Sequence, residues 1–438
     1  MKKFIIIALI VITTTTLTAC SKELIFDLIG ESEVSYTVDS DYVEKGFLAR
    51  VNNEDLSEYV TIDSDIDPTQ AGDYTVTYTL DYEGDVRTLT RTVYYREDGC
   101  TVIDGTDLTE CQVFWTQYLH TVVKLRIYYQ GDTYNGAVAN IFDNVELLLD
   151  YYHKLSDKYN NYNNVTNVKT INDDPTATHV IDEPLFDMIQ FALDHQDEVD
   201  DLFNIALGPV LLLWHDYRES CLTNFTDPVC EVPPMEQLQA RNAFTDPAGI
   251  TMDETNHTIT MESGMSLDLG GMSKGFISRV LIEYLDDLNL HGYLLNNGES
   301  NISIGGTHPT RENGKFLLAI TDPTFETSYY ATVYLGAGDQ LVTSGDYQQY
   351  YEVDGEIYHH IINPNTLMPE RYSRSVSIVT DDPALADIYS TAIFTMPLVD
   401  GLAFVNGIDN LEAIWYTIDD QIVFSDGFEA QYLDDTYK

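Results

Sequence analysis

Positive charge is scarce in this chain. Its 438 residues include 22 Lys or Arg against 72 Asp or Glu, so the formal net charge is −50. A field of this sign repels polyanions, which argues against nucleic-acid binding, and it favours solubility and divalent cations near the surface. Hydrophobic residues make up 44% of the chain, an ordinary share for a folded protein. The length predicts about two or three domains.

Long apolar runs are also lacking. Residues 1–3 are basic and residues 4–12 are apolar, a run too short for a spanning helix and typical of a secretory signal. Leu17-Thr18-Ala19-Cys20 follows and resembles the bacterial lipobox. We therefore expect a signal peptide at residues 1–19, lipid on Cys20, and a protein anchored to the cell membrane on its extracytoplasmic face. An uncleaved anchor or a chance cysteine is the alternative.

Cysteine is rare, with five in the whole chain. If Cys20 carries lipid, four remain, an even number in an oxidising compartment. Proximity in sequence favours the pairs Cys100–Cys111 and Cys221–Cys230, and four reduced thiols are the alternative. The chain has no C-x-x-C motif or nearby histidine pair beside these cysteines, which disfavours a zinc site.

Histidine and cysteine are both missing from residues 34–96, where the pattern is that of β structure. Two alternating runs, residues 72–80 and 88–95, flank Glu83-Gly84-Asp85 and predict a hairpin. The stretch resembles the small immunoglobulin-like modules of bacterial surface proteins. We expect a spacer or adhesion domain at residues 34–97, between a linker at 20–33 and a linker at 98–111 that holds the first possible disulfide.

Helical and strand patterns mix without strict alternation in the remaining residues, 112–438, which predicts an α+β domain. The predicted helices are 138–159, 183–199, 273–285 and 384–394, and the predicted strands are 113–129, 293–296, 316–320, 329–335, 375–379 and 413–416. Gly208-Pro209 is expected to break the apolar run at residues 203–214.

Residues 266–276 read SLDLGGMSKGF and contain the strongest local signal for a binding site. A strand-like piece around Asp268 is followed by the pair Gly270-Gly271, by Lys274 and by an amphipathic helix. Exposed N–H groups and the positive end of a helix favour an anion, so the run predicts a cradle for a phosphate-bearing ligand. A plain turn is the alternative, and the spacing is not that of a Walker loop.

Polar stretches downstream could carry chemistry, although each has a simpler explanation. Residues 343–347 read as a loop and residues 296–302 as a hairpin. His359 and His360 would point to opposite faces of a strand, and histidine accepts protons well near neutral pH. Asp387 and Thr391 are four residues apart and would share one helical face, as two oxygen ligands of Mg²⁺ require. Helix capping by Asp387 is the alternative.

In their order and spacing these motifs resemble those of the ApbE-type flavin transferases, from about Thr116 to the C-terminus. The resemblance implies transfer of FMN from FAD to a threonine hydroxyl of an extracytoplasmic acceptor protein, with Mg²⁺ bound and AMP released. The matching motifs are Ala206-Leu207-Gly208-Pro209, residues 268–275, Asn297-Gly298-Glu299-Ser300, residues 343–347, residues 359–364, and Ala386-Asp387 with Ser390-Thr391.

The same resemblance implies roles for individual residues. His360 would accept the threonine proton, and Asp387 would act in catalysis as a metal ligand beside Thr391 and the carbonyl of Gly271. Asp268 would hydrogen-bond the FAD rather than bind the metal. The expected FAD contacts are Leu119, Tyr162 (or Tyr159 if the aromatic segment is shifted), Ala206, Leu207, Gly208, Asp268, Lys274, Ser344, Gly345, His360 and Ile361.

Three positions depart from the family pattern. Leu119-His120-Thr121 stands for Met-Gly-Thr, and Asn297-Gly298-Glu299 stands for Gly-Gly-Asp. Leu367 replaces the glycine after Asn-Pro-x-Thr, which suggests a different turn there. Two other functions compete with transfer: an FAD-binding redox or sensor lipoprotein without transferase activity, and a surface protein in which the β domain carries the function.

Overall fold

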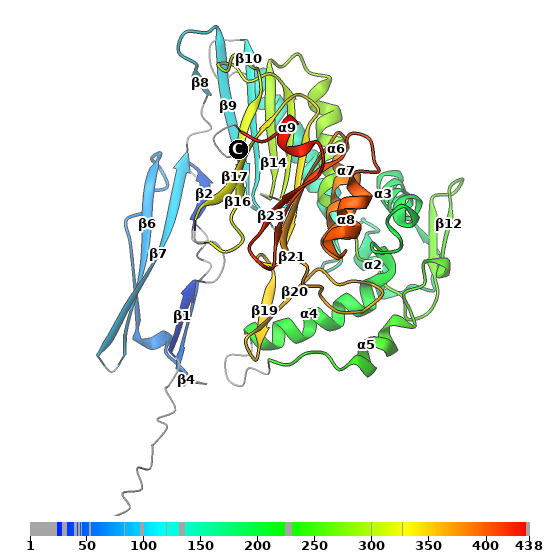
Figure 1. Ribbon diagram of the computed structural model, residues 1–438. Helices are drawn as coiled ribbons and strands as arrows, with labels where there is room; N and C mark the ends of the chain where they lie inside the picture. Colours follow the sequence, from blue (N-terminus) through cyan, green and yellow to red (C-terminus); the bar gives the residue numbers. More distant parts are fainter. Residues whose placement is uncertain are drawn as a thin grey trace, which may run out of the picture.

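The computed structural model shows a small all-β unit and a larger unit that mixes helices and strands (Figure 1). This arrangement confirms the predicted fold class. The predicted signal peptide and Cys20 lie outside the described residues, as do His120 and Glu299. The structure describes residues 24–28, 33–38, 42, 44, 46–51, 54–82, 84–96, 100–119, 121–130, 136–223, 230–298, 300–325 and 327–434.

The small unit consists of two sheets that enclose a core containing Tyr78 and Leu80. One sheet has the order β1 (Leu24–Leu28), β3 (Phe47–Val51), β4 (Glu54–Asp55). The other has the order β2 (Glu33–Thr37), β7 (Asp85–Arg96), β6 (Gly72–Tyr82), β5 (Val60–Ser64), with η1 (Ser57–Tyr59) before β5. The β6–β7 hairpin is as predicted. The unit begins earlier than residue 34, because β1 pairs with β3 where a linker was expected.

A nine-stranded antiparallel sheet forms the centre of the large unit, with the order β23-β22-β21-β18-β15-β14-β10-β9-β8. Its strands are β8 (Cys100–Val102), β9 (Leu108–Trp115), β10 (Val123–Gln130), β14 (Gly292–Asn297), β15 (Asn301–Gly306), β18 (Gln340–Gly345), β21 (Ser373–Thr380), β22 (Glu412–Thr417) and β23 (Ile422–Phe424). The alternation of strand side chains gives this sheet two apolar faces, each of which must be covered.

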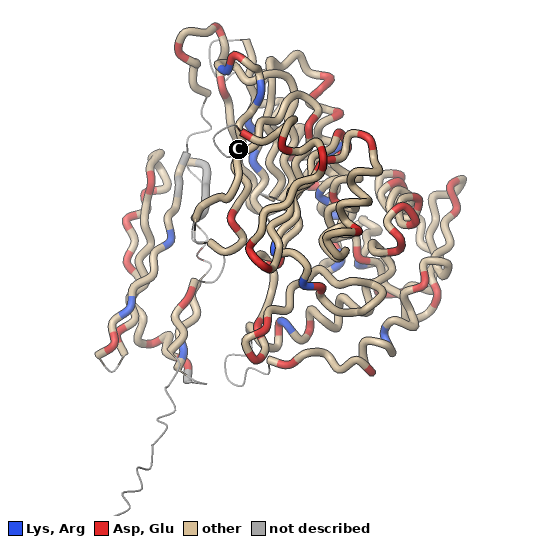
Figure 2. Tube along the Cα trace, in the orientation of Figure 1, with Lys and Arg blue, Asp and Glu red and all other residues tan. Residues whose placement is uncertain are grey.

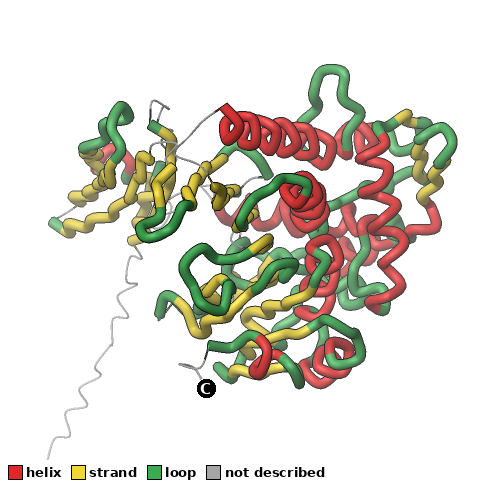
Figure 3. The backbone as a smooth tube through the Cα atoms, turned by 90° about the horizontal axis from the view of Figure 1, so that it is seen from above, coloured by secondary structure: helices red, strands yellow, loops and turns green. Residues whose placement is uncertain are grey.

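Three helices, α1 (Gly136–Ser156), α6 (Ser273–Asp286) and α7 (Pro383–Phe394), pack against one face of the sheet. Figure 3 shows that most helices of the molecule lie on one side of the strands. The hairpin of β16 (Phe316–Thr321) and β17 (Tyr329–Leu335) packs on the other face. Strand β21 serves both layers, because Val376 and Ile378 join the helix-side core and Val379 joins the other. The large unit therefore has three layers.

The remaining helices and strands of the large unit surround these layers. They are α2 (Val168–Asp173), β11 (His179–Val180), α3 (Glu183–His195), η2 (Gln196–Val199), η3 (Ile205–Leu207), α4 (Gly208–Thr223), α5 (Met235–Asn242), η4 (Pro247–Gly249), β12 (Ile250–Asp253), β13 (Thr258–Met261), the hairpin of β19 (Tyr350–Val353) and β20 (Glu356–His359), α8 (Leu398–Val405) and α9 (Phe428–Gln431). No helix in the described part of the chain is long and apolar enough to span a bilayer.

Two predictions about chain breaks were wrong. The single strand predicted at residues 113–129 is two strands, β9 and β10, joined by a turn in which Leu119 adopts a φ of 55°. Gly208-Pro209 does not interrupt an element but begins α4. Proline is tolerated in the first turn of a helix, because its missing N–H has no partner there in any case.

The simpler explanations given for two polar stretches near the predicted site do not hold. Asp387 does not cap α7, because Asp382 does so by accepting hydrogen bonds from the N–H groups of Ala384 (2.9 Å) and Leu385 (3.2 Å). Residues 343–345 are not a loop but the end of strand β18.

Both predicted disulfides are present. Cys100 and Cys111 are directly paired residues of β8 and β9, so this bridge belongs to the edge of the large sheet rather than to a linker. Cys221 near the end of α4 is bonded to Cys230, which precedes α5. Figure 2 shows Asp and Glu positions along the chain of both units, with few Lys or Arg positions among them.

Candidate functional site

Helix α7 carries a buried carboxylate at its contact with α6. The side chain of Asp387 accepts hydrogen bonds from the Gly275 N–H (2.6 Å) and from Nδ2 of Asn301 (3.2 Å), and the residue is only 6% exposed. Burial raises the pKa of Asp387, and the charge of Lys274 only partly opposes this. Within the described chain, Asp387 forms no ion pair. Its negative charge is therefore poorly compensated.

This contact depends on the absence of a side chain at Gly275. A Cβ at that position would lie 2.0 Å from the Pro383 carbonyl oxygen and 3.0 Å from Cγ of Asp387. Only glycine lets the first turn of α6 approach α7 closely enough for its N–H to reach the carboxylate.

The Gly-Gly turn before α6 meets the same part of α7. A Cβ on Gly271 would lie 3.9 Å from Cγ2 of Thr391, which is one helical turn beyond Asp387. The structure thus brings the three predicted metal residues, Gly271, Asp387 and Thr391, to one place. A carboxylate, a hydroxyl and a carbonyl are hard oxygen donors, and the poorly compensated charge of Asp387 fits a cation such as Mg²⁺.

Lys274 lies beside this group. Its Nζ donates a hydrogen bond to Oγ of Ser300, and burial lowers its pKa while the charge of Asp387 opposes that effect. Asn297 supports the start of α6 by donating from Nδ2 to the Lys274 carbonyl (3.2 Å) and to Oγ of Ser278 (3.3 Å). The β14–β15 hairpin therefore positions the lysine.

Asp268 forms the second buried carboxylate of the site and is 8% exposed. It accepts a hydrogen bond from the Gly270 N–H (2.9 Å) and forms an ion pair with Lys158. Burial opposes ionisation, but Lys158 and the hydrogen bonds outweigh it and hold the pKa of Asp268 below its usual value. Lys158 was not predicted from the sequence, where its only signal is its place just before residues 159–172, a segment rich in tyrosine and asparagine.

The segment Ala206-Leu207-Gly208 contacts the stretch that holds Asp268, which is irregular and not the strand-like piece predicted from the sequence. The Asp268 N–H donates to the Ile205 carbonyl (2.8 Å), and a Cβ at Gly208 would lie 2.4 Å from the Ser266 carbonyl oxygen. All three predicted contact residues of this segment are buried.

The two neighbouring histidines have different environments. His359 is 3% exposed; its Nε2–H donates to the Glu370 carbonyl (2.8 Å) and its Nδ1 accepts from the Ile361 N–H (3.3 Å). Burial lowers the pKa of His359 to about 4, so this ring is neutral and both its nitrogens are engaged. It is a structural residue.

His360 is exposed, and its Nδ1 lies 3.3 Å from the Gln349 carbonyl oxygen. A carbonyl only accepts, so Nδ1 carries the proton and the lone pair is on Nε2. The protein packed around the ring removes part of its hydration and, together with His359 and the charges of Arg218 and Lys274, lowers the pKa of His360. The ring therefore stays neutral at pH 7 and can accept a proton at Nε2.

The remaining predicted ligand contacts form two groups. In the first group, Ser344 donates a hydrogen bond to Oγ of Ser390 on α7 (3.0 Å). The next residue, Gly345, is buried, and Ile361 is buried in the main core. Leu119 and Tyr162 instead meet at His153: the Leu119 N–H donates to Nδ1 (3.3 Å) and the Tyr162 hydroxyl lies 3.4 Å from Nε2.

This second group is connected to Asp268 through residues 157 and 158. The hydroxyl of Tyr162 donates to Asp157 (2.7 Å), and the next residue, Lys158, pairs with Asp268. The centre of the Tyr159 ring lies 5.2 Å from Nζ of Lys158. Either tyrosine can thus border a ligand held at Asp268.

The turn at Leu367, where leucine stands in place of the family's glycine, has a backbone conformation that is uncommon for leucine. Leu367 has a φ of 62°, which is the left-handed conformation that glycine adopts readily. The leucine side chain is buried in a cluster with Trp214, whose indole Nε1–H donates to the Leu367 carbonyl (3.0 Å). Burial of this side chain compensates for the backbone strain.

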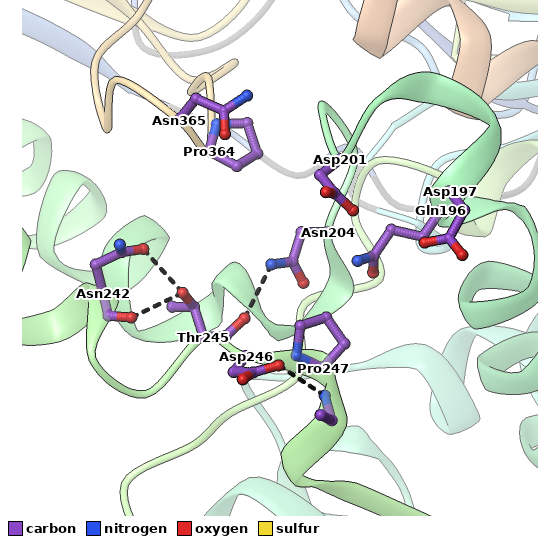
Figure 4. A pocket seen from close by; sticks show the side chains of 11 residues that line it. Gln196, Asp197, Asp201, Asn204, Asn242, Thr245, Asp246, Pro247, Pro364 and Asn365 are labelled. Carbon is purple, nitrogen blue, oxygen red and sulfur yellow. Dashed lines mark hydrogen bonds between the residues drawn. The ribbon is translucent and has the colours of Figure 1, made fainter.

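A polar hollow of about 380 Å³ lies next to the loop that follows the histidines (Figure 4). It is lined by Pro364, Asn365 and residues that follow α3 and α5, and the side chain of Asn204 donates to the Thr245 carbonyl (2.9 Å) in its wall. None of the predicted site residues lines this hollow, so we do not assign the chemistry to it.

Comparison with known proteins gives the family of each unit. Residues 119–415 match the model of the ApbE family, and residues 26–94 match the bacterial surface protein Ig-like domain. The chain is 28% identical over 251 residues to the FAD:protein FMN transferase of Klebsiella pneumoniae, covering 56% of this chain and 72% of the relative. It is 26% identical over 258 residues to that of Treponema pallidum, covering 58% and 70%.

Solved structures show the same fold. The ApbE protein of Thermotoga maritima superimposes with a TM-score of 0.61 at 25% identity, over 73% of this chain and 98% of that one. The apo flavinyl transferase ApbE of Pseudomonas stutzeri gives a TM-score of 0.61 at 21% identity, over 75% and 98%.

Proposed function

Because the chain belongs to the ApbE family, we propose that it is an FAD:protein FMN transferase that uses Mg²⁺ to move FMN from FAD onto a threonine hydroxyl and releases AMP. The single observation that carries the proposal is the convergence of Asp387, Thr391 and the Gly271 turn, with Lys274 beside them. Phosphoryl transfer depends on holding and neutralising phosphate oxygens, and this group of residues suits that task.

Asp387, Thr391 and the Gly271 carbonyl would hold the magnesium ion. When bound, Mg²⁺ neutralises charge on the diphosphate of FAD. Lys274 adds a cationic contact near the same phosphates, and Asp268 accepts a hydrogen bond from the FAD. The other roles belong to side chains that the structure already holds in place.

His360 acts as the general base. Its Nε2 takes the proton from the threonine hydroxyl while the threonine oxygen forms a bond to the phosphorus of the FMN half. The bond from that phosphorus to the bridging oxygen breaks, and AMP leaves with the bridging oxygen. His359 does not compete for this role, because both its ring nitrogens are already bonded.

The acceptor and the enzyme would meet outside the cytoplasmic membrane. This part of the proposal rests on the signal-like residues 1–19 and on lipid attached to Cys20. The match of residues 26–94 to an Ig-like domain of bacterial surface proteins supports the same compartment.

The test is an incubation of the purified protein with FAD, Mg²⁺ and a threonine-bearing acceptor protein. We expect AMP release together with a mass increase of one FMN on an acceptor threonine, and neither product when Mg²⁺ is chelated. Stable binding of FAD without AMP or adduct would instead support the redox or sensor lipoprotein.

A further inference from the structure

We propose that Arg218 is a positioning residue that holds the base His360 in its working tautomer through Gln349. Arg218 lies on α4, and its Nη1 donates to Oε1 of Gln349 (3.1 Å). The backbone carbonyl of Gln349 in turn accepts hydrogen bonds from the His360 N–H (3.0 Å) and from Nδ1 (3.3 Å). Arg218 therefore fixes the segment whose carbonyl orients the imidazole.

The second terminal nitrogen of the Arg218 guanidinium contacts a residue that lies near the partner of Asp268. Nη2 of Arg218 lies 3.0 Å from Nδ1 of His215, which must accept because arginine only donates. The His215 ring lies 5.7 Å from the ring of Tyr159, which neighbours Lys158, the partner of Asp268. One side chain thus joins the base to the group that is expected to hold the FAD.

Positioning, rather than direct contact with phosphate, is the role that the geometry supports. Nη1 and Nη2 have protein partners, and Nε lies 3.7 Å from Oε1 of Glu219. The Arg218 side chain is only 16% exposed. A planar fork of this kind is specific to arginine, because the single ammonium of a lysine cannot bond both partners in fixed directions.

This inference rests on the proposed role of His360, and its test separates the two. The first measurement is nitrogen NMR of the histidine rings in the ligand-free protein, with the His360 signal assigned by a His360→Gln variant. We expect His360 to be protonated at Nδ1 in the wild type. In the variants Arg218→Met, Arg218→Lys and Gln349→Leu, the His360 ring should instead populate both neutral tautomers. This readout does not require transferase activity.

The second measurement compares kcat for AMP release with the affinity for FAD. A general base contributes about 10²–10⁴-fold, so partial loss of its orientation should lower kcat about tenfold to a hundredfold. The affinity for FAD should stay within about twofold, because no flavin contact is removed. Arg241→Met removes an exposed arginine of the neighbouring helix α5 and is the matched control; it should change neither quantity.

Two outcomes would overturn the proposal. One is an unchanged Nδ1–H tautomer of His360 in a folded Arg218→Met protein. The other is a loss confined to FAD affinity with kcat unaltered, which would indicate a substrate contact. The wild type could have the Nδ1–H tautomer and the variants lose it while the wild type transfers no FMN. In that case the positioning of His360 stands and the proposed function fails.

Discussion

At the residue scale, the two buried carboxylates of the site are stabilised in different ways. Asp268 has a lysine partner, and its pKa lies below the usual value. Asp387 has only hydrogen bonds and a more distant lysine, and its pKa lies above the usual value. A buried charge without a partner is costly, so the second carboxylate is the one that gains most from a bound cation.

The first prediction follows from this difference. Asp387→Asn should lower the rate of AMP release about a hundredfold or more, because it removes the only formal negative charge among the proposed metal ligands. FAD should still bind, though more weakly, and Thr391→Val should have a milder effect because it removes one neutral oxygen. AMP release at limiting Mg²⁺ and a fluorescence titration with FAD measure the two effects.

The control for this prediction is Asp382→Asn at the true cap of α7. Asparagine also caps helices well, and its amide oxygen can still accept from Arg279, the ion-pair partner of Asp382, so this variant should keep both activity and FAD binding. Full activity of Asp387→Asn at limiting Mg²⁺ would refute the metal assignment.

The second prediction concerns Lys158→Met. In the wild type, the contribution of ionised Asp268 is present above the ordinary carboxyl range and is lost as the pH falls through its lowered pKa. Without Lys158, burial dominates and raises that pKa, so FAD affinity should begin to fall at a higher pH than in the wild type. FAD titrations between about pH 4 and 8 measure this shift. Identical pH profiles for the two proteins would contradict the role of the ion pair.

At the element scale, the spacing between α6 and α7 sets the geometry of the site. The third prediction is that Gly275→Ala will push the helices apart, since its Cβ would lie 2.0 Å from the Pro383 carbonyl oxygen. Overpacking of this kind costs about 1–3 kcal/mol of unfolding free energy. It should also break the hydrogen bond to Asp387 and so reduce transfer. Denaturant unfolding and AMP release are the measurements.

Gly336→Ala is the matched control for this substitution. A Cβ at Gly336 would meet no atom closer than 3.7 Å, which is ordinary contact. We therefore expect little change in stability or activity. Equal stability of the two variants would show that the α6–α7 contact can relax.

Elements with strong periodicity could be predicted from the sequence, while unusual backbone conformations could not. The helices α6 and α7 and the strand β17 lie close to their predicted positions. The turn between β9 and β10 was missed because it contains no glycine or proline and places Leu119 in a left-handed conformation. Gly208-Pro209 signals either a break or a helix start, and local pattern alone does not distinguish the two.

The same limit applies to the site. Motif residues that follow one another, such as Asp268, Gly271 and Lys274, could be named from the sequence. Lys158 and Arg218 could not, because each acquires its role from a partner more than 100 positions away. Such pairs are products of tertiary packing, and no periodic signal marks them.

At the scale of the whole molecule, the position of the enzyme relative to the membrane depends on residues outside the described structure. The fourth prediction is that Cys20→Ala will release the protein from the membrane fraction or block its processing. Lipid on Cys20 would otherwise retain it. Fractionation and electrophoretic mobility are the measurements, and an unchanged distribution with unchanged mobility would sink the lipobox hypothesis.

The disulfide between β8 and β9 has a mechanical consequence if the chain is pulled from its N-terminal end. Tension applied at that end would pass through the Ig-like unit and enter the catalytic unit at β8, a strand of only three residues at the edge of the sheet. The few backbone hydrogen bonds between β8 and β9 would then break one after another. The Cys100–Cys111 bond would instead carry the load directly into β9, so the short β8 ladder would not have to bear it.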